Sequence, residues 1–303
     1  MTAAAGMIAG YAADLAFGDP RRGHPVAGFG RLAGLAERRW YAPTRARGLA
    51  ITGALVALPA VGARFAGRRT SAIALVTWAA LGGRSLRREA AAVADLIEAD
   101  RIDDARTRLR SLCGRDPAAL DAAGLSSAVV ESLAENTSDA VVGALWWGAV
   151  AGPGGTAAYR AANTLDAMFG HRDDRYRRFG WAPARLDDAL NWPAARLSVA
   201  LTCLLAPLVG GNAGAAWRAV RDDGGKHPSP NAGRVEAAFA GALALSLGGP
   251  LTYDGTVERR PVLGDGPRPG LADIERAARL SSLVSAAALL VCVSATLIRE
   301  RRR

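Results

Sequence analysis

The sequence is poor in lysine, cysteine and aromatic residues, and each shortage argues against a class of fold, partner or site. Lys226 is the single lysine, so the formal charge of +10 comes from arginine, as in high-GC coding, and does not by itself indicate nucleic acid. Aromatic residues make up 6%, which gives little support to a β-sandwich. Cys113, Cys203 and Cys292 are far apart and lack metal-ligand spacing, so no disulfide framework and no zinc or iron–sulfur site is predicted.

Familiar nucleotide and targeting motifs are also missing. No G-x-x-x-x-G-K-[ST] sequence occurs, and "GFGRLAG" misses the dinucleotide fingerprint by one residue. The amides of "GPGGTAAYR", a glycine-rich turn leading into a predicted helix, could hold a phosphate, but this signal is weak alone. The first residues lack a basic start and Asp14 interrupts their apolar run, so no secretory signal is predicted.

Several apolar segments are long enough to consider as membrane spans, since a spanning helix needs about 20 residues. They cover roughly 3–18, 49–66, 70–83, 140–158, 196–216, 235–249 and 279–298. The last is the strongest, and the "RERRR" that follows it predicts a cytoplasmic tail. The segments at 70–83, 140–158 and 235–249 are short or interrupted, so half-spans or buried helices of a soluble fold stay open for them.

We therefore predict an all-α fold: a polytopic helical membrane protein with about 4–6 transmembrane helices and cytoplasmic helical segments. One domain covers residues 1–303, with a polar helical insert at about 84–139 and polar motif segments at about 159–195 and 218–234.

A polar stripe precedes one of the apolar segments. In "ESLAENTSD", Glu131, Glu135, Asn136 and Asp139 fall on one side of a helix at 100° per residue, and the apolar residues fall on the other. For the segment taken alone, the alternative is a solvated face of an amphipathic helix.

Four further patches have a similar polar density. They are "DLAFGDPRRGHPVAGFG" with Asp19 and His24; "YRAANTLDAMFG" with Tyr159, Asn163 and Asp166; "RLDDALNWPAARL" with Asp187, Asp188, Asn191 and Arg196; and "DDGGKHPSPNAGRVEAA" with Lys226, His227, Ser229 and Asn231. Each has a structural alternative: Gly-Asp-Pro as a turn, Asn231 as a helix N-cap, and Asp187 and Asp188 as ion-pair partners of Arg185.

Taken together, the patches indicate a catalytic or ligand-binding site. Carboxylates and amides beside apolar helices are costly unless they are paired or bind a ligand, so they are candidates for function. Asp, Glu and Asn supply hard oxygen ligands, which suit Mg²⁺ better than Zn²⁺.

These patches also resemble a known family. "GDPRRGHPVAGFG", "ESLAENTSD", "YRAANTLDAMFGHRDDRYRRFGWAPARLDD", "HPSPNAG" and "LGG…Y" occur in the order found in the membrane-bound adenosylcobinamide-phosphate synthases of cobalamin biosynthesis. The resemblance implies ATP-dependent amide formation between adenosylcobyric acid and (R)-1-amino-2-propanol or its O-phosphate, in a polytopic helical protein. The corrinoid is then a substrate, and ATP and Mg²⁺ are expected at the site.

Roles follow as hypotheses from this chemistry. Mg²⁺ and phosphate are assigned to Glu131, Glu135, Asp139 and Asp166, of which Glu135 and Asp166 are also catalytic candidates. The base that keeps the amine unprotonated is His24 or His227, and the residues leave this choice open. The substrate-binding candidates are Asp19, Asn136, Arg160, Asn163, Asp187, Asp188, Arg196, Lys226, Ser229 and Asn231.

Two other classes of protein compete with the enzyme. A membrane transporter would use intramembrane carboxylates to carry ions, but the polar motifs lie at helix ends and loops. A nucleic-acid binder would need a contiguous arginine face, whereas arginine here is mixed with acidic residues, so no nucleic acid is expected. We expect a multi-pass protein of the cytoplasmic membrane with its active site in the cytoplasm. A homo-oligomer and contacts with other enzymes of corrinoid synthesis stay open.

Overall fold

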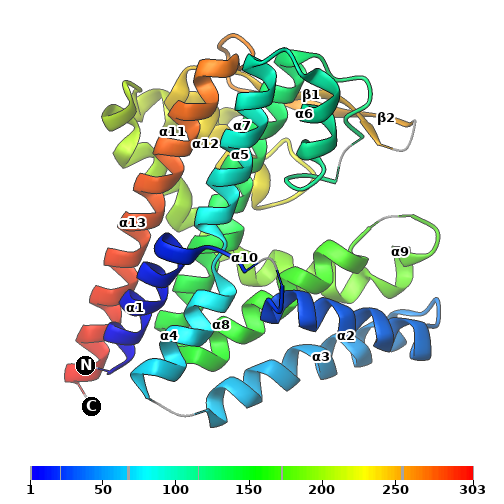
Figure 1. Ribbon diagram of the computed structural model, residues 1–303, viewed down its shortest axis with the longest axis vertical. Helices are drawn as coiled ribbons and strands as arrows, with labels where there is room; N and C mark the ends of the chain where they lie inside the picture. The colour runs from blue at the N-terminus through cyan, green and yellow to red at the C-terminus, as the bar shows by residue number, and fades with distance from the viewer. Residues whose placement is uncertain are drawn as a thin grey trace. The chain divides into compact units, whose positions relative to one another are not determined.

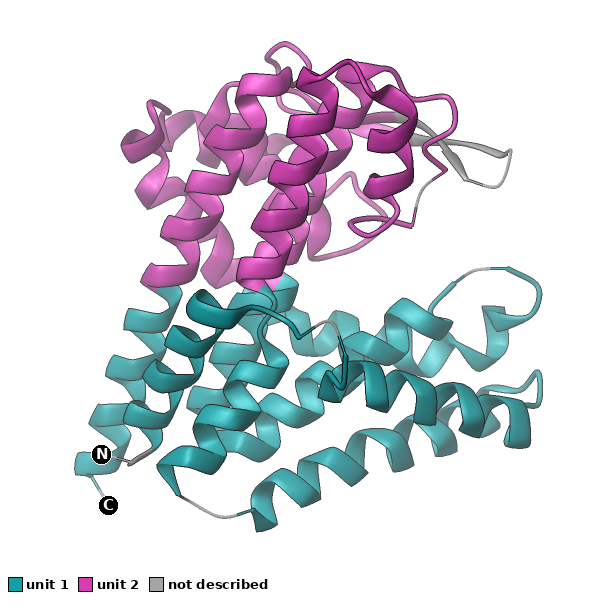
Figure 2. Ribbon diagram, in the orientation of Figure 1, with its two compact units in different colours: residues 1–82, 139–194, 288–303 teal, residues 83–138, 195–287 magenta. Residues whose placement is uncertain are grey.

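The computed structural model describes residues 2–20, 22–66, 69–114, 116–171, 173–253 and 256–302 (Figure 1). Helices dominate the described chain, which confirms the predicted helical class, and its single sheet is a two-stranded hairpin. The chain divides into two compact units (Figure 2). Unit 1 comprises Met1–Gly82, Asp139–Ala194 and Ala288–Arg303, and unit 2 comprises Gly83–Ser138 and Ala195–Ala287.

Unit 1 combines helices that fall on predicted apolar segments, such as α1, α3 and α4, with helices that do not, such as α2 and α9. Its elements are α1 (Thr2–Phe17), α2 (Pro25–Trp40), α3 (Arg45–Phe65), α4 (Thr70–Ala80), the π-helix η1 (Ser138–Val142) except for its first residue, α8 (Gly143–Phe169), α9 (Tyr176–Phe179) and the parts of α10 (Trp181–Leu205) and α13 (Leu271–Arg301) that fall within it. A buried cluster from α2, α3, α8 and α9 includes Ala33, Leu55, Leu165, Phe169 and Phe179. Its small residues let the helices pack closely.

Unit 2 contains the polar helices and the hairpin. Its elements are α5 (Gly83–Glu98), α6 (Ile102–Leu109), α7 (Ala122–Thr137), η2 (Ala206–Val209), α11 (Ala213–Asp222), α12 (Ala232–Leu243), β1 (Leu247–Tyr253), β2 (Thr256–Leu263) and the remaining parts of α10 and α13. Every residue of α12 except Arg234 is buried, so this helix forms the centre of the unit. The first segment of unit 2 is Gly83–Ser138. The polar insert expected at 84–139 stays a prediction.

Three helices in the described residues are long and apolar enough to cross a membrane. They are α3, the continuous Trp181–Val209 formed by α10 and η2, and α13. The α1 segment Ala3–Phe17 is apolar but shorter. Three is fewer than the four to six expected, and the number of helices that do cross a bilayer stays a prediction.

Two apolar segments do not form the continuous helices that were considered for them. The 196–216 segment is interrupted at Gly210, whose φ of 72° ends η2 before α11 begins. The 235–249 segment stops being helical at Leu243, because Ala244 adopts a left-handed φ of 57° and the chain then enters β1. This antiparallel hairpin was not predicted.

Helix α8 is bent within its "GPGG" sequence. Gly152 has a φ of 70° and a ψ of −161°, a conformation that favours glycine, and Pro153 lacks the N–H that would continue the helical ladder. The bend divides the predicted 140–158 segment and separates an apolar first part of α8 from a second part that carries Tyr159, Asn163 and Asp166.

Gly48 and Gly53 provide a matched test of the packing around α3. A methyl group at Gly48 would overlap the carbonyl oxygen of Phe179, whereas one at Gly53 would meet no atom within 4 Å. We expect Gly48→Ala to destabilise the protein by about 1–3 kcal/mol through overpacking. Gly53→Ala should be neutral or stabilising, since alanine favours a helix. Thermal unfolding in detergent measures both, and equal midpoints for the two variants would contradict this account.

Candidate functional site

The predicted site residues are divided between the two units, and in each unit several of them form hydrogen-bonded groups. Unit 1 holds Asp19, His24, Asp139, Arg160, Asn163, Asp166, Asp187 and Asp188. Unit 2 holds Glu131, Glu135, Asn136, Arg196, Lys226, His227, Ser229 and Asn231.

Asp187 is the centre of the group in unit 1. Its side chain is buried on α10, and its two oxygens accept amide N–H groups from Asn163 at 3.3 Å and Asn191 at 2.9 Å. Asn163 in turn accepts a hydrogen bond from Arg160 at 3.1 Å. Because buried carboxylates are costly without donors, these amides account for the position of Asp187. The Asn163 bond also joins α8 to α10, whereas Asn191 lies on α10 itself.

Tyr159 extends this chain to η1. Its buried hydroxyl lies 2.6 Å from Oδ1 of Asn191 and 2.8 Å from the backbone oxygen of Asp139. Burial and the charges of Asp139 and Asp187 raise the pKa of Tyr159 well above its ordinary value, so the hydroxyl stays protonated and donates. We call the chain of Arg160, Asn163, Asp187, Asn191 and Tyr159 the Asp187 network.

Asp166 and Asp188 lie beside this network. Both contribute negative charge at Asp187, and Asp188 lies 3.9 Å from Arg185. The ion pair foreseen for this segment therefore forms at Asp188, and Asp187 is bound to amides instead. A side chain at Gly170 would overlap the Asp166 carboxylate, so glycine leaves room for that group at the end of α8.

His24 and Asp19 form a second polar pair in unit 1. Nε2 of His24 lies 3.4 Å from an Asp19 carboxylate oxygen, and the imidazole side chain is only 13% exposed. The ring meets the edge of Trp78, whose indole N–H donates to the carbonyl of Gly18 at 3.2 Å. The Gly-Asp-Pro turn is thereby held against α4.

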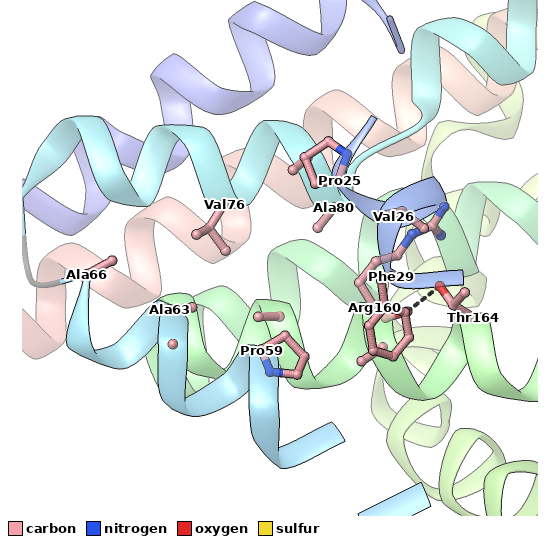
Figure 3. Close-up of a pocket in the computed structure, with 14 residues that line it drawn as sticks. Pro25, Val26, Phe29, Pro59, Ala63, Ala66, Val76, Ala80, Arg160 and Thr164 are labelled. Atoms are coloured by element: carbon pink, nitrogen blue, oxygen red, sulfur yellow. Dashed lines mark hydrogen bonds between the residues drawn. The ribbon is translucent and has the colours of Figure 1, made fainter. Parts of the chain in front are cut away.

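A pocket of about 340 Å³ opens next to His24, between α2, α3, α4 and α8 (Figure 3). Its lining is almost entirely apolar and includes Pro25, Phe29, Pro59 and Val76. Arg160 is the charged residue among the described lining residues, and its Nε atom is buried without a hydrogen-bond partner. The same arginine therefore contacts both the pocket and the Asp187 network.

In unit 2, Glu131 connects two motifs that are far apart in the sequence. Its Oε1 accepts hydrogen bonds from Ser127 at 3.1 Å and from the backbone N–H of Gly248 at 2.9 Å. Gly248 has a φ of 82°, and a side chain there would overlap the carbonyl of Pro261. "ESLAENTSD" and "LGG" thus contact each other through a buried carboxylate.

The solvated-face interpretation of "ESLAENTSD" is wrong for part of the stripe. Glu131 and Ser132 are 4% and 3% exposed, because α7 is covered on both sides from Leu125 to Ala134. Glu135, Asn136 and Asp139 are half-buried. Asn136 donates to the carbonyl of Ser132 at 2.9 Å, so its amide is held locally.

The "HPSPNAG" segment folds into a tight loop that contacts α10. The Ser229 N–H donates to Nδ1 of His227 at 3.0 Å, and the Ser229 hydroxyl accepts the N–H groups of Asn231 and Ala232. Asn231 occupies the N-cap position of α12 but does not cap it through its side chain. Its Oδ1 accepts a hydrogen bond from Arg196 at 2.6 Å instead.

Lys226 is exposed and pairs with Asp223 at 2.6 Å. The other Asp223 oxygen accepts the N–H of Gly264 at 2.9 Å, which ties the loop to the end of the hairpin. The ion pair with Asp223 therefore fixes the position of the Lys226 ammonium group next to "HPSPNAG".

The predicted metal ligands were Glu131, Glu135, Asp139 and Asp166. No group of three or more His, Cys, Asp and Glu side chains close enough to hold a metal was found among the residues that the structure describes. Glu131 and Glu135 belong to unit 2, and Asp139 and Asp166 to unit 1. A common site for all four stays a prediction.

Several structurally important groups were not among the predicted site residues. Tyr159 and Asn191 were seen in the motifs, and the i, i+4 spacing of Asp187 and Asn191 could have paired that carboxylate with an amide. Ser127 and Glu131 have the same spacing. The Gly248 contact carried no local signal, because it joins residues 117 positions apart.

Comparison with known proteins supplies a family. Residues 7–281 match the model of the CobD/Cbib protein family. A "Cobalamin biosynthesis protein CobD" from Mycobacterium tuberculosis is 50% identical, covering 99% of this chain and 97% of that relative. Relatives of the same description from Chromobacterium violaceum and Rhodobacter capsulatus are 43% and 40% identical, covering 92% and 96% of this chain and 94% and 96% of their own lengths. No solved structure matches significantly.

The Asp187 network leads to a test at Tyr159. Tyr159→Phe removes the hydroxyl and leaves Oδ1 of buried Asn191 without this donor, which should cost about 1–3 kcal/mol. Tyr41→Phe is the matched control, because the Tyr41 hydroxyl bonds to the Arg175 carbonyl at an exposed position. Thermal unfolding should show a lower midpoint for Tyr159→Phe than for Tyr41→Phe, and the reverse order would contradict the importance of the network.

Proposed function

Because the chain belongs to the CobD/Cbib protein family, we propose that it is an ATP-dependent synthase of cobalamin biosynthesis. The reaction joins a carboxylate of adenosylcobyric acid to (R)-1-amino-2-propanol, or its O-phosphate, through an amide bond and yields adenosylcobinamide or its phosphate. The observation that carries the proposal is the match itself, which extends over nearly the whole chain and contains every motif described above.

The chemistry needs an activated carboxylate. A carboxylate does not condense with an amine in water at neutral pH, so the substrate carboxylate first takes the terminal phosphoryl group of ATP and releases ADP. The amine nitrogen then attacks the acyl carbon, phosphate leaves, and a base accepts the proton of the amine. Such a sequence requires cations beside the phosphates and a neutral amine.

The residues suit Mg²⁺ that arrives with ATP. Mg²⁺ keeps several water molecules and takes only one or two protein carboxylates when phosphates supply other ligands. The candidates for this role are Glu135 in unit 2, and Asp139 and Asp166 in unit 1, whose half-buried carboxylates can supply oxygen ligands. Bound there, Mg²⁺ would neutralise phosphate charge. Arg160, Arg196 and Lys226 provide cations for phosphate or for the corrinoid side groups.

Glu131 and Asp187 have a different role in this proposal. Oε1 of Glu131 accepts hydrogen bonds from Ser127 and Gly248, and Asp187 accepts two side-chain amides. We infer that both carboxylates position helices. Three helices of spanning length support a multi-pass protein, and use of ATP supports a site on the cytoplasmic side of the cell membrane.

Product formation tests the proposal directly. Detergent-solubilised protein with ATP, Mg²⁺, adenosylcobyric acid and aminopropanol phosphate should yield a cobinamide-type product in mass spectrometry, and chelation of Mg²⁺ should abolish it. We expect Glu135→Gln and Asp166→Asn to lower turnover by roughly 10²-fold or more, since each removes a charge at the phosphates. Glu98→Gln, at an exposed position of α5, is the control.

Two results would argue against this assignment. Near-normal turnover in both carboxylate variants would remove their catalytic role. Absence of product from the unmodified protein, together with ion flux in sealed vesicles, would favour the transporter.

We propose His24 rather than His227 as the base, because the contacts of the two rings differ. Nδ1 of His227 already accepts the Ser229 N–H, which places the proton of the neutral ring on Nε2. In His24, Asp19 faces Nε2 and favours a proton there, so Nδ1 of the neutral ring keeps a lone pair. We infer that His227 orders its loop and His24 accepts the proton.

Asparagine substitutions separate these roles, because the Asn Oδ1 can replace Nδ1 as an acceptor but is not a base. We expect His24→Asn to lower kcat by about 10²-fold, the usual size of general-base catalysis. His227→Asn should keep most activity, whereas His227→Ala should lose it with the loop bond. A larger loss of kcat in His227→Asn than in His24→Asn would reverse the assignment.

A further inference from the structure

Three helix ends of unit 1 meet and expose a set of arginines. α2 ends at Trp40, α3 begins at Arg45 and α10 begins at Trp181, with α9 beside them (Figure 1). The rings of Tyr41 and Phe179 are 5.2 Å apart, and the Arg45 guanidinium lies 5.3 Å from the Trp181 ring. The exposed arginines, hereafter the arginine rim, are Arg38, Arg39, Arg45, Arg47, Arg177 and Arg178.

The segment that carries part of the rim is held in place. Arg175 forms an ion pair with buried Glu37 and lies over the Tyr41 ring at 4.4 Å, and the Tyr41 hydroxyl donates to the Arg175 carbonyl at 2.8 Å. The charge of Glu37 is therefore matched by Arg175 and does not neutralise the rim. Asp173 and Asp174 are the other acidic residues of this segment, which leaves an excess of positive charge.

The surroundings of the rim are those of a bilayer interface. Only 22% of the apolar window of α3 is buried, so most of this helix needs another apolar cover. Leu49, one turn beyond Arg45, is 59% exposed, and Trp40 and Trp181 are 54% and 39% exposed at the level of the rim. Tryptophan and arginine above an apolar helix surface typify the headgroup region of a membrane.

We propose that the arginine rim binds the headgroups of anionic phospholipids, with Trp40 and Trp181 in the interfacial layer and α3 extending into the acyl chains. Clustered arginines attract anionic lipids. This proposal concerns a surface outside the catalytic assignment and stands independently of it.

Lipid selectivity of the full-length protein tests the proposal. Native mass spectrometry in detergent, with equal amounts of phosphatidylglycerol and phosphatidylcholine, measures the ratio of the two lipids bound. The test variant is Arg38→Gln, Arg39→Gln, Arg177→Gln and Arg178→Gln combined. Its control makes the same charge change at exposed positions of unit 2: Arg88→Gln, Arg110→Gln, Arg218→Gln and Arg221→Gln.

We expect the unmodified protein and the control to prefer phosphatidylglycerol, and the rim variant to lose this preference by roughly tenfold or more. Thermal unfolding in phosphatidylcholine should be unchanged, since the substituted side chains are exposed. Equal losses in both variants would show nonspecific attraction to net charge and would overturn the proposal. An unchanged preference in the rim variant would also overturn it, and would favour an acidic protein as the partner of this surface.

Discussion

The arrangement of unit 1 depends on how a buried carboxylate is satisfied. Asp187 lies inside the helical packing, where an ionised group without donors would be costly. Amide groups of Asn163 and Asn191 bind its two oxygens, and Tyr159 continues the chain to the backbone of η1. The bonds from Asn163 to Asp187 and from Tyr159 to Asn191 join α8 to α10 and restrain their relative rotation. The motif residues of α8 therefore occupy one defined face, and Arg160 is directed both to Asn163 and to the apolar pocket.

The helices could be predicted because their signals are local. Apolar runs at 49–66 and 279–298 correspond to α3 and α13, and the charged periodicity after residue 83 corresponds to α5, α6 and α7. The hairpin was not found in this way, because the apolar segment considered at 235–249 runs from α12 into β1 as far as Gly249. Gly248 and Gly249 adopt φ values of 82° and 93°, and Glu131 binds the Gly248 N–H from a distant part of the chain. Tertiary contact, rather than local propensity, sets that boundary.

In the candidate site, too, local sequence predicts some features and tertiary contacts decide the others. Residue type and spacing were enough to select Glu131, Asn163, Asp187 and Asn231 as polar residues that should make specific contacts. Their partners were not predictable, because Asn231 could equally have capped α12, and Asp187 could have paired with Arg185. In the structure Arg196 takes the Asn231 oxygen, and two amides take Asp187. Such choices depend on which helices meet, and a single sequence does not contain that information in its spacing.

Burial then separates the carboxylates by role. Glu37, Glu131 and Asp187 are 6%, 4% and 8% exposed, and each binds donors that hold secondary-structure elements together. Glu135, Asp139 and Asp166 are half-buried near helix ends, and we propose them as candidates to bind a phosphate-bound cation. A buried carboxylate that already accepts several hydrogen bonds gains little from a metal, because those bonds would have to break first. We therefore assign the chemistry of the proposed synthase to the second group, and the first group positions the helices that carry it.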